Sequence, residues 1–178
     1  MKRVICILSL LVALTAGFSS CTYREYAPAE YPAPLLYIPA SLDGVVEISG
    51  ESALCNLSED GRKLLVHLGV AVSGLDRKEF PVTLSYARSK VNMMIEDGTF
   101  APGTLPLPEA VCNIPEDLVI TADVTAAAFD LAIQTNYLKD PEYLGRKFAV
   151  GVKIDSEQAE VNPDFGTVIL LIDPSFIN

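Results

Sequence analysis

The sequence predicts an all-β fold, an antiparallel β-sandwich of about seven or eight short strands with one short helix. Apolar and polar residues alternate with a period of two in one segment after another, which is the pattern of strands with one buried face. Turn signals such as Glu59-Asp60-Gly61 and Asn162-Pro163-Asp164 separate these segments. The chain has 178 residues, 50% of them hydrophobic and 20% charged, which is typical of one globular domain.

Five segments carry the alternation most clearly: 64–72, 82–86, 129–134, 148–154 and 168–172. Shorter candidate strands are 35–38, 45–48 and 118–121. We expect three apolar faces to meet in one core, namely Leu64/Val66/Leu68/Val70, Phe129/Leu131/Ile133 and Phe148/Val150/Val152/Ile154. The segment 168–172 is apolar on both faces, which predicts a strand that is buried on both sides.

One segment has helical rather than strand spacing. Its apolar residues run from Val91 to Ile95, Ser89 is a candidate N-cap, and Gly98 is a stop signal. We therefore expect a helix over 90–97 that covers one end of the sandwich. Its methionines are interpreted as core residues rather than metal ligands, because no Cys or His lies near them in the sequence.

Residues 1–20 have the composition of an export signal. Two basic residues precede an apolar run that is too short to span a membrane, and small residues follow it. The motif Phe18-Ser19-Ser20-Cys21 resembles a lipobox, which predicts lipid attachment to Cys21. Gly17-Phe18-Ser19 also fits ordinary cleavage after Ser19, so a secreted protein without lipid is the alternative.

Residues 21–34 are interpreted as a tether, since Pro28, Pro32 and Pro34 interrupt regular structure there. The sandwich domain then comprises residues 35–178. A lipid on the first residue of the tether would hold this domain in the cell envelope, at the outer membrane by our expectation. The sequence does not distinguish the cell surface from the periplasmic face.

Charge and composition argue against several function classes. Thirteen Lys and Arg against 23 Asp and Glu give a net charge of -10, which disfavours nucleic acid and acidic substrates as partners. One His and no Trp leave little material for a histidine-based metal or catalytic site. We expect no cofactor, no bound metal and no nucleic acid partner.

The order of segments resembles a known family. LLYIPAS, IEDGTF, LPLPEAVCNIP and DLVITA precede the long run YLGRKFAVGVKIDSEQAEVNPDFGTVILLIDP. This order is similar to the domain of unknown function 1735, which occurs in surface lipoproteins of the Bacteroidetes type, often together with glycan-related modules. The resemblance covers most of residues 35–173. It implies an immunoglobulin-like β-sandwich, an accessory or adhesin-like role and no catalytic residues.

Two cysteines lie in the predicted sandwich domain, Cys55 and Cys112. In an oxidising compartment they could form a disulfide that stabilises the fold by roughly 4 kcal/mol. Free cysteines are also often small buried side chains. The sequence leaves both alternatives open.

Few residues suggest catalysis. His67 is interpreted as a half-exposed strand histidine, because no motif supplies the Ser and Asp of a triad. Neighbouring carboxylates at 59–60, 96–97, 116–117 and 140–142 lie beside turn signals, where solvated loop charges are common. We therefore name no catalytic residue and expect a protein that is not an enzyme. A glycan-acting hydrolase that uses two loop carboxylates is the alternative.

The loop 135–145 is the candidate binding segment. Tyr137 and Tyr143 offer flat rings with polar tips, which suit a sugar ring or a protein surface when Trp is absent. Tyr143 is expected to pack inward as a scaffold residue, whereas Tyr137 is the surface candidate. The sequence thus predicts a lipid-anchored, adhesin-like binding or structural module of the cell envelope, whose partner is a glycan or an envelope protein.

Overall fold

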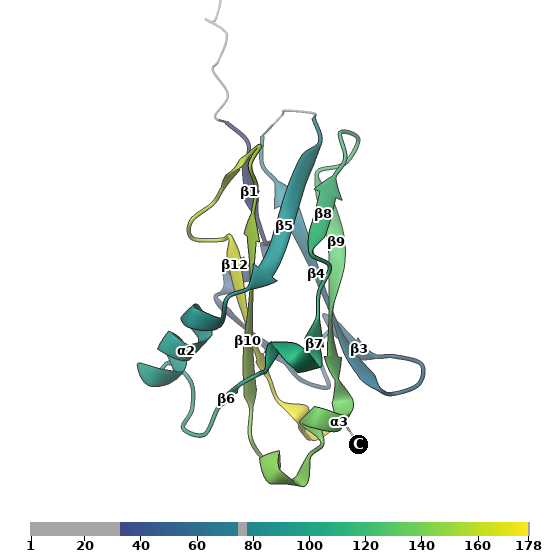
Figure 1. The fold of residues 1–178 in the computed structure, drawn as a ribbon, viewed down its shortest axis with the longest axis vertical. Coiled ribbons are helices and arrows are strands. Elements are labelled where there is room, and N and C mark those ends of the chain that lie inside the picture. Colours follow the sequence, from purple (N-terminus) through teal and green to yellow (C-terminus); the bar gives the residue numbers. More distant parts are fainter. Residues whose placement is uncertain (1–32, 75–77, 178) are drawn as a thin grey trace, which may run out of the picture. The chain divides into compact units, whose positions relative to one another are not determined.

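The structure is a computed structural model that describes residues 33–74 and 78–177. The predicted signal peptide 1–20, the lipidation residue Cys21 and nearly all of the tether lie outside the described residues. Among the residues that are described, no helix is long and apolar enough to cross a membrane. The described chain forms two β-sheets that face each other across one hydrophobic core (Figure 1).

Sheet A contains the longest strand pair of the fold. Its path is β11 (Glu160–Val161), β1 (Leu35–Tyr37), β4 (Lys63–Val72), β9 (Ala126–Gln134) and β7 (Cys112–Asn113), and β3 (Cys55–Leu57) pairs with β4 beside this path. Strands β4 and β9 pair antiparallel from Lys63 opposite Gln134 to Ala71 opposite Ala126. This register places every second residue of both strands toward the core.

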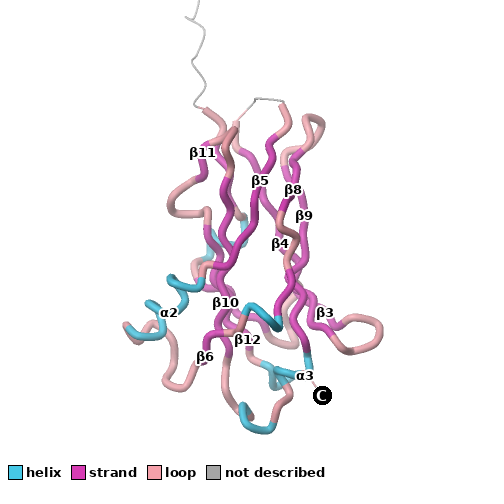
Figure 2. Tube along the Cα trace, viewed as in Figure 1, coloured by secondary structure: helices cyan, strands magenta, loops and turns pink. Residues whose placement is uncertain are grey.

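Sheet B is built around a central strand with apolar residues on both faces. Its path is β2 (Val45–Ile48), β12 (Thr167–Ile172), β10 (Phe148–Asp155), β5 (Phe80–Tyr86) and β8 (Asp117–Ile120), and β6 (Leu105–Pro106) pairs with β10 beside this path. Strand β10 pairs antiparallel with β12 on one side and with β5 on the other. Figure 2 shows the strands of both sheets in magenta and the short helical turns in cyan.

The predicted β-sandwich is confirmed, with one difference in strand direction. The long pairs are antiparallel, but β1–β11, β2–β12 and β6–β10 are parallel. The described residues hold twelve strands rather than seven or eight. The additional ones, β3, β6, β7 and β11, have only two or three residues, which is too few for a period of two to be recognised.

The three predicted apolar faces meet in a single core, as expected. All of their eleven residues belong to one cluster of buried side chains, which also includes Phe80, Ile120 and Leu170. Strand β12 is buried on both sides, because Ile169 and Leu171 belong to a second cluster on the outer face of sheet B.

The second cluster lies beneath helix α2 (Arg88–Glu96), which packs on the outer face of sheet B (Figure 1). The expected position at one end of the sandwich is therefore wrong. The expected cap is also wrong: Ala87 is the N-cap residue, and no side chain caps the helix. Gly151 of β10 permits this packing, since a Cβ there would come within 3.0 Å of Ala87 and 3.1 Å of Val91. Gly98 ends the segment with φ +79° as expected.

Cys55 and Cys112 are both free thiols, so the structure does not support the disulfide. Cys55 on β3 is opposite Val66, and Cys112 on β7 is opposite Ile133. Strands β4 and β9 lie between them, which separates the two Cα atoms by about 14 Å at the usual spacing of strands. A disulfide needs Cα atoms within about 7 Å. Both thiols pack instead against the core, in agreement with the alternative interpretation.

Candidate functional site

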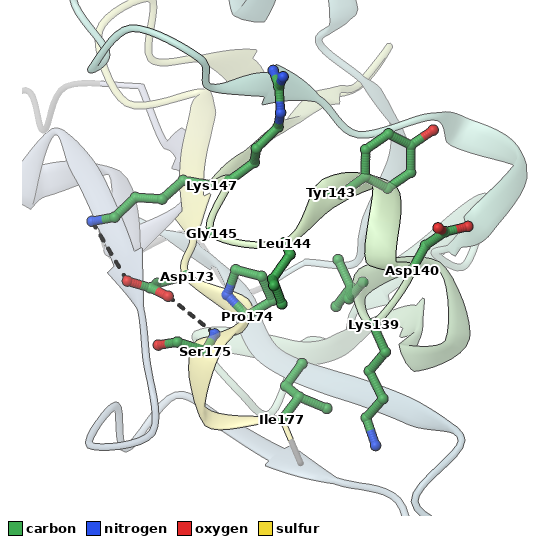
Figure 3. A pocket seen from close by; sticks show the side chains of 12 residues that line it. Lys139, Asp140, Tyr143, Leu144, Gly145, Lys147, Asp173, Pro174, Ser175 and Ile177 are labelled. Carbon is green, nitrogen blue, oxygen red and sulfur yellow. Dashed lines mark hydrogen bonds and ion pairs between the residues drawn. The ribbon is translucent and has the colours of Figure 1, made fainter.

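A concave site lies at the end of the sandwich where three segments distant in sequence meet. They are α3 (Thr135–Leu138), the loop that begins with the 3₁₀ turn η3 (Pro141–Tyr143), and the C-terminal 3₁₀ turn η4 (Pro174–Phe176). Figure 1 shows the last described residues of the chain, in yellow, near α3. The cavity between these segments, here called the end pocket, has a volume of about 680 Å³ and is shown in Figure 3.

The floor of the end pocket is apolar. Leu138 and Ile177 line it and are buried, with 3% and 6% of their surfaces exposed. Leu144 lies beside this floor and is 87% exposed, although it is a large aliphatic residue. Gly145 follows it with φ +76°, a conformation that favours glycine and turns the chain back toward β10. The loop therefore presents an apolar side chain to solvent directly beside a cavity.

The two tyrosines of the predicted binding loop form an aromatic cluster with Phe148. Their ring centroids are 5.1 Å apart, and each lies 5.8 Å from the centroid of the buried Phe148 ring. Tyr143 is half-buried and packs against the core, as expected. It also lines the end pocket. Tyr137 is half-buried as well, so the two tyrosines differ less in exposure than expected, and the choice of Tyr137 as the surface candidate stays a prediction. Desolvation, together with the neighbouring Tyr143 hydroxyl, raises the pKa of Tyr137 to about 12.

The rim of the end pocket is polar and partly organised by Asp173. Its carboxylate accepts a hydrogen bond of 3.0 Å from the Ser175 backbone N–H and lies 3.9 Å from the Lys147 ammonium group (Figure 3). The hydrogen bonds from Ser175, followed by the charge of Lys147, lower the pKa of Asp173. Asp173 is therefore an ionised acceptor at neutral pH. Asp140 caps η3 by accepting a hydrogen bond of 3.0 Å from the Glu142 N–H.

Two of the other carboxylates considered for hydrolysis, Asp60 and Asp97, hold turns together. Hydrogen bonds from Ser58 and the Arg62 backbone lower the pKa of Asp60, and hydrogen bonds from Thr99 lower the pKa of Asp97. A glycosidase general acid needs the opposite, a raised pKa, so neither aspartate suits that role. Among the described residues, no three Cys, His, Asp or Glu side chains are grouped as a metal site.

His67 lies on the outer face of sheet A, away from the end pocket. Its Nδ1 atom lies 2.7 Å from an Asp130 carboxylate oxygen, and its Nε2 atom faces the Asn56 amide oxygen. About half of the His67 side chain is exposed, as predicted. Both ring nitrogens already face a side-chain oxygen, and no serine lies in this chain of contacts. The side chains of Asn56, His67 and Asp130 therefore connect β3, β4 and β9 on the exposed face of sheet A.

The comparison with known proteins identifies the fold alone. No family model matches the chain, and no curated protein matches it by sequence. Among solved structures, a candidate carbohydrate-binding protein from Bacteroides ovatus has a TM-score of 0.60 at 10% identity, over 78% of this chain and 36% of that one. A multidomain Bacteroides ovatus protein that includes DUF1735 has a TM-score of 0.53 at 15% identity, over 79% of this chain and 45% of that one.

An enzyme shares the architecture as well. The Bacteroides thetaiotaomicron endoglycosidase EndoBT-3987 has a TM-score of 0.50 at 14% identity, over 72% of this chain and 28% of that one. The chain thus spans less than half the length of each of these three proteins. The structural likeness agrees with a DUF1735-like sandwich. What those proteins bind or hydrolyse does not follow for this chain from the fold.

Proposed function

We propose that this protein is a non-catalytic, lipid-anchored module of the DUF1735 type that binds carbohydrate in the end pocket at the cell envelope. The observation that carries the proposal is the exposed Leu144 beside a cavity with an apolar floor and a polar rim. Isolated exposed leucines are common on protein surfaces, but this one extends the apolar lining of a pocket of ligand size.

The chemistry of the end pocket suits a sugar ring. A pyranose has an apolar face of C–H groups and an equatorial rim of hydroxyl groups. Leu144 and the Tyr143 ring offer surfaces for the apolar face. Asp173 and Ser175 offer an acceptor and a hydroxyl group at the rim for the sugar hydroxyls. The candidate carbohydrate-binding protein of the same fold supports this choice of ligand class.

A hydrolytic role has less support. The acidic residues that line the end pocket are Asp140 and Asp173, and both are already used to organise backbone turns. The low pKa of Asp173 disqualifies it as a general acid. The endoglycosidase of similar fold is matched over only 28% of its length, so the likeness does not extend to most of that protein. We therefore assign binding rather than hydrolysis to this site.

The test is retention of the full-length protein on a panel of immobilised neutral and acidic polysaccharides. Leu144→Ala should weaken binding roughly tenfold, since about two methylene groups would lose contact with the ligand. The melting temperature should stay at that of the parent, because Leu144 is 87% exposed.

Leu42→Ala is the matched control. Leu42 is 56% exposed in the 3₁₀ turn η1 (Pro39–Asp43) and does not line the end pocket. Equal retention of the two variants and the parent, or retention on no polysaccharide, would contradict the proposal. Release of new reducing ends from a bound polysaccharide would contradict its non-catalytic part.

A further inference from the structure

Another pocket, of about 410 Å³, lies beside the start of α3. It is lined by Arg62, Lys63, Gln134, Thr135 and Asn136, and therefore has no aliphatic or aromatic side chain in its lining. We call it the basic pocket.

The sequence register of sheet A builds the basic pocket. Lys63 and Gln134 are opposite each other at the ends of β4 and β9, so their side chains extend from the same face of the sheet. The buried Thr135 donates hydrogen bonds from its backbone N–H to the Arg62 carbonyl, at 2.9 Å, and from its hydroxyl to the Gly61 carbonyl, at 2.8 Å. The start of α3 is therefore fixed to the turn that carries the basic side chains.

Helix geometry connects the two pockets. Asn136 lines the basic pocket and Lys139 lines the end pocket. Asn136 lies within α3, and Lys139 is its C-cap residue, three positions later. Residues three positions apart lie on the same face of a helical turn. Both side chains are exposed. A chain of sugar units that crosses this face would contact both pockets.

The net charge of the residues that line the two pockets is opposite in sign to that of the whole protein. Arg62 and Lys63 line the basic pocket, and Lys139, Arg146 and Lys147 line the end pocket. Only two acidic residues, Asp140 and Asp173, are among the residues that line these two pockets, and both belong to the end pocket. The complete sequence has 23 acidic and only 13 basic residues. The overall charge therefore disfavours an acidic partner, whereas the local charge favours one.

Within the described part of the chain, two of these five cations, Lys63 and Arg146, form no ion pair with an acidic side chain. Arg62 lies 3.8 Å from Asp60, and Lys147 lies 3.9 Å from Asp173. By contrast, Lys63 and Arg146 make no ion pair with any residue in the described ranges 33–74 and 78–177. An arginine and a lysine that lie beside adjoining pockets without a counter-ion are suited to bind carboxylate or sulfate groups.

We propose that the ligand is an acidic oligosaccharide that crosses α3, with a neutral ring face in the end pocket and a carboxylate or sulfate group against Lys63 in the basic pocket. This inference rests on the proposed function and adds the ligand class. Gln134 and Asn136 supply amide groups for the hydroxyls next to the anionic group.

The test compares three tetrasaccharides with the full-length protein by isothermal titration calorimetry. Tetragalacturonate carries carboxylates, a κ-carrageenan tetrasaccharide carries sulfates, and mannotetraose is neutral. Lys63→Gln should weaken binding of the acidic probe roughly five- to tenfold, and added salt should weaken binding by the parent. Lys153→Gln removes the same charge from an exposed position on β10 that lines neither pocket, so it should bind like the parent.

The outcomes separate the two proposals. Binding of one acidic probe with loss in the Lys63 variant supports the acidic ligand, and the probe that binds identifies carboxylate or sulfate. Binding of mannotetraose alone, or equal binding by the Lys63 and Lys153 variants, overturns the acidic ligand and leaves carbohydrate binding intact. Binding of none of the three probes overturns this inference, and retention on the polysaccharide panel then decides the proposed function separately.

Discussion

Cys112 is a thiol whose ionisation is opposed by its surroundings. It lies at the inner side of β7 and is half-buried against the core. Burial, followed by the negative charge of Glu109, raises the pKa of Cys112 from its ordinary value of 9.0 to about 12. Burial, followed by the charges of Cys112 and Glu109, also raises the pKa of Tyr86 to about 12. Both groups are therefore held neutral by the fold in a pH range where the unfolded chain would ionise them.

The stability of the protein should fall at alkaline pH for this reason. A raised folded-state pKa stabilises the fold fully below the unfolded value, and this contribution is lost as the pH rises through the folded value. For Cys112 the loss begins near pH 9 and continues toward pH 12. Cys112→Ala should reduce the decline in the free energy of unfolding by about 1 kcal/mol between pH 9 and 10. Urea denaturation of the parent and the variant at each pH measures the free energy of unfolding. If this free energy fell equally with pH in both proteins, Cys112 would not be the group responsible.

Single residues show where sequence reasoning was sufficient and where it was not. The half-exposed position of His67 follows from strand alternation, which is a local property. The separation of Cys55 and Cys112 depends instead on two strands that lie between them, and no local pattern records the order of strands in a sheet. The partial burial of Tyr137 likewise depends on tertiary contacts, with Tyr143 and Phe148, that no local pattern records.

Strand β10 is the element on which sheet B depends. It pairs with β12, β5 and β6, and its inward side chains belong to the common core. Its alternation was visible in the sequence because it has eight residues. The two-residue strands β6, β7 and β11 show no such pattern and form only because the long strands offer them partners. Helix α2 was predicted from its spacing, but its position on sheet B requires the tertiary contact at Gly151.

Val150→Asp should unfold the domain. Val150 is 3% exposed, lies opposite Leu170 and belongs to the apolar core cluster of the described residues. An unpaired buried carboxylate costs several kcal/mol, which is comparable with a typical total stability of about 5–15 kcal/mol. Circular dichroism during thermal denaturation measures the effect. Lys153→Asp places the same side chain on the exposed face of the same strand and should retain a cooperative transition. A Val150 variant that melts like the parent would remove β10 from the core.

At the scale of the whole molecule, the candidate site is made by convergence rather than by a motif. The end pocket combines residues near position 140 with the C-terminal turn at 174–176, and the basic pocket combines residues 62–63 with 134–136. The sequence indicated the loop 135–145 through its tyrosines. It did not indicate Lys63 or the C-terminal turn, because their proximity to that loop depends on the pairing of β4 with β9 and the path of β12.

The last prediction concerns Cys21, on which we expect the location of the molecule to depend. The motif Phe18-Ser19-Ser20-Cys21 predicts a thiol that carries lipid, and we expect the proline-rich segment after it to act as a tether between the lipid and the sandwich. Two acyl chains suffice for stable membrane attachment, whereas the domain offers no apolar helix of spanning length among its described residues. Cys21→Ala should therefore move the protein from the membrane fraction to the soluble fraction and abolish labelling with palmitate. Cys6→Ala changes a cysteine within the apolar run and should leave both properties as in the parent. A Cys21 variant that remains in the membrane fraction, together with a parent that takes up no palmitate, would show that the anchor is not this lipid.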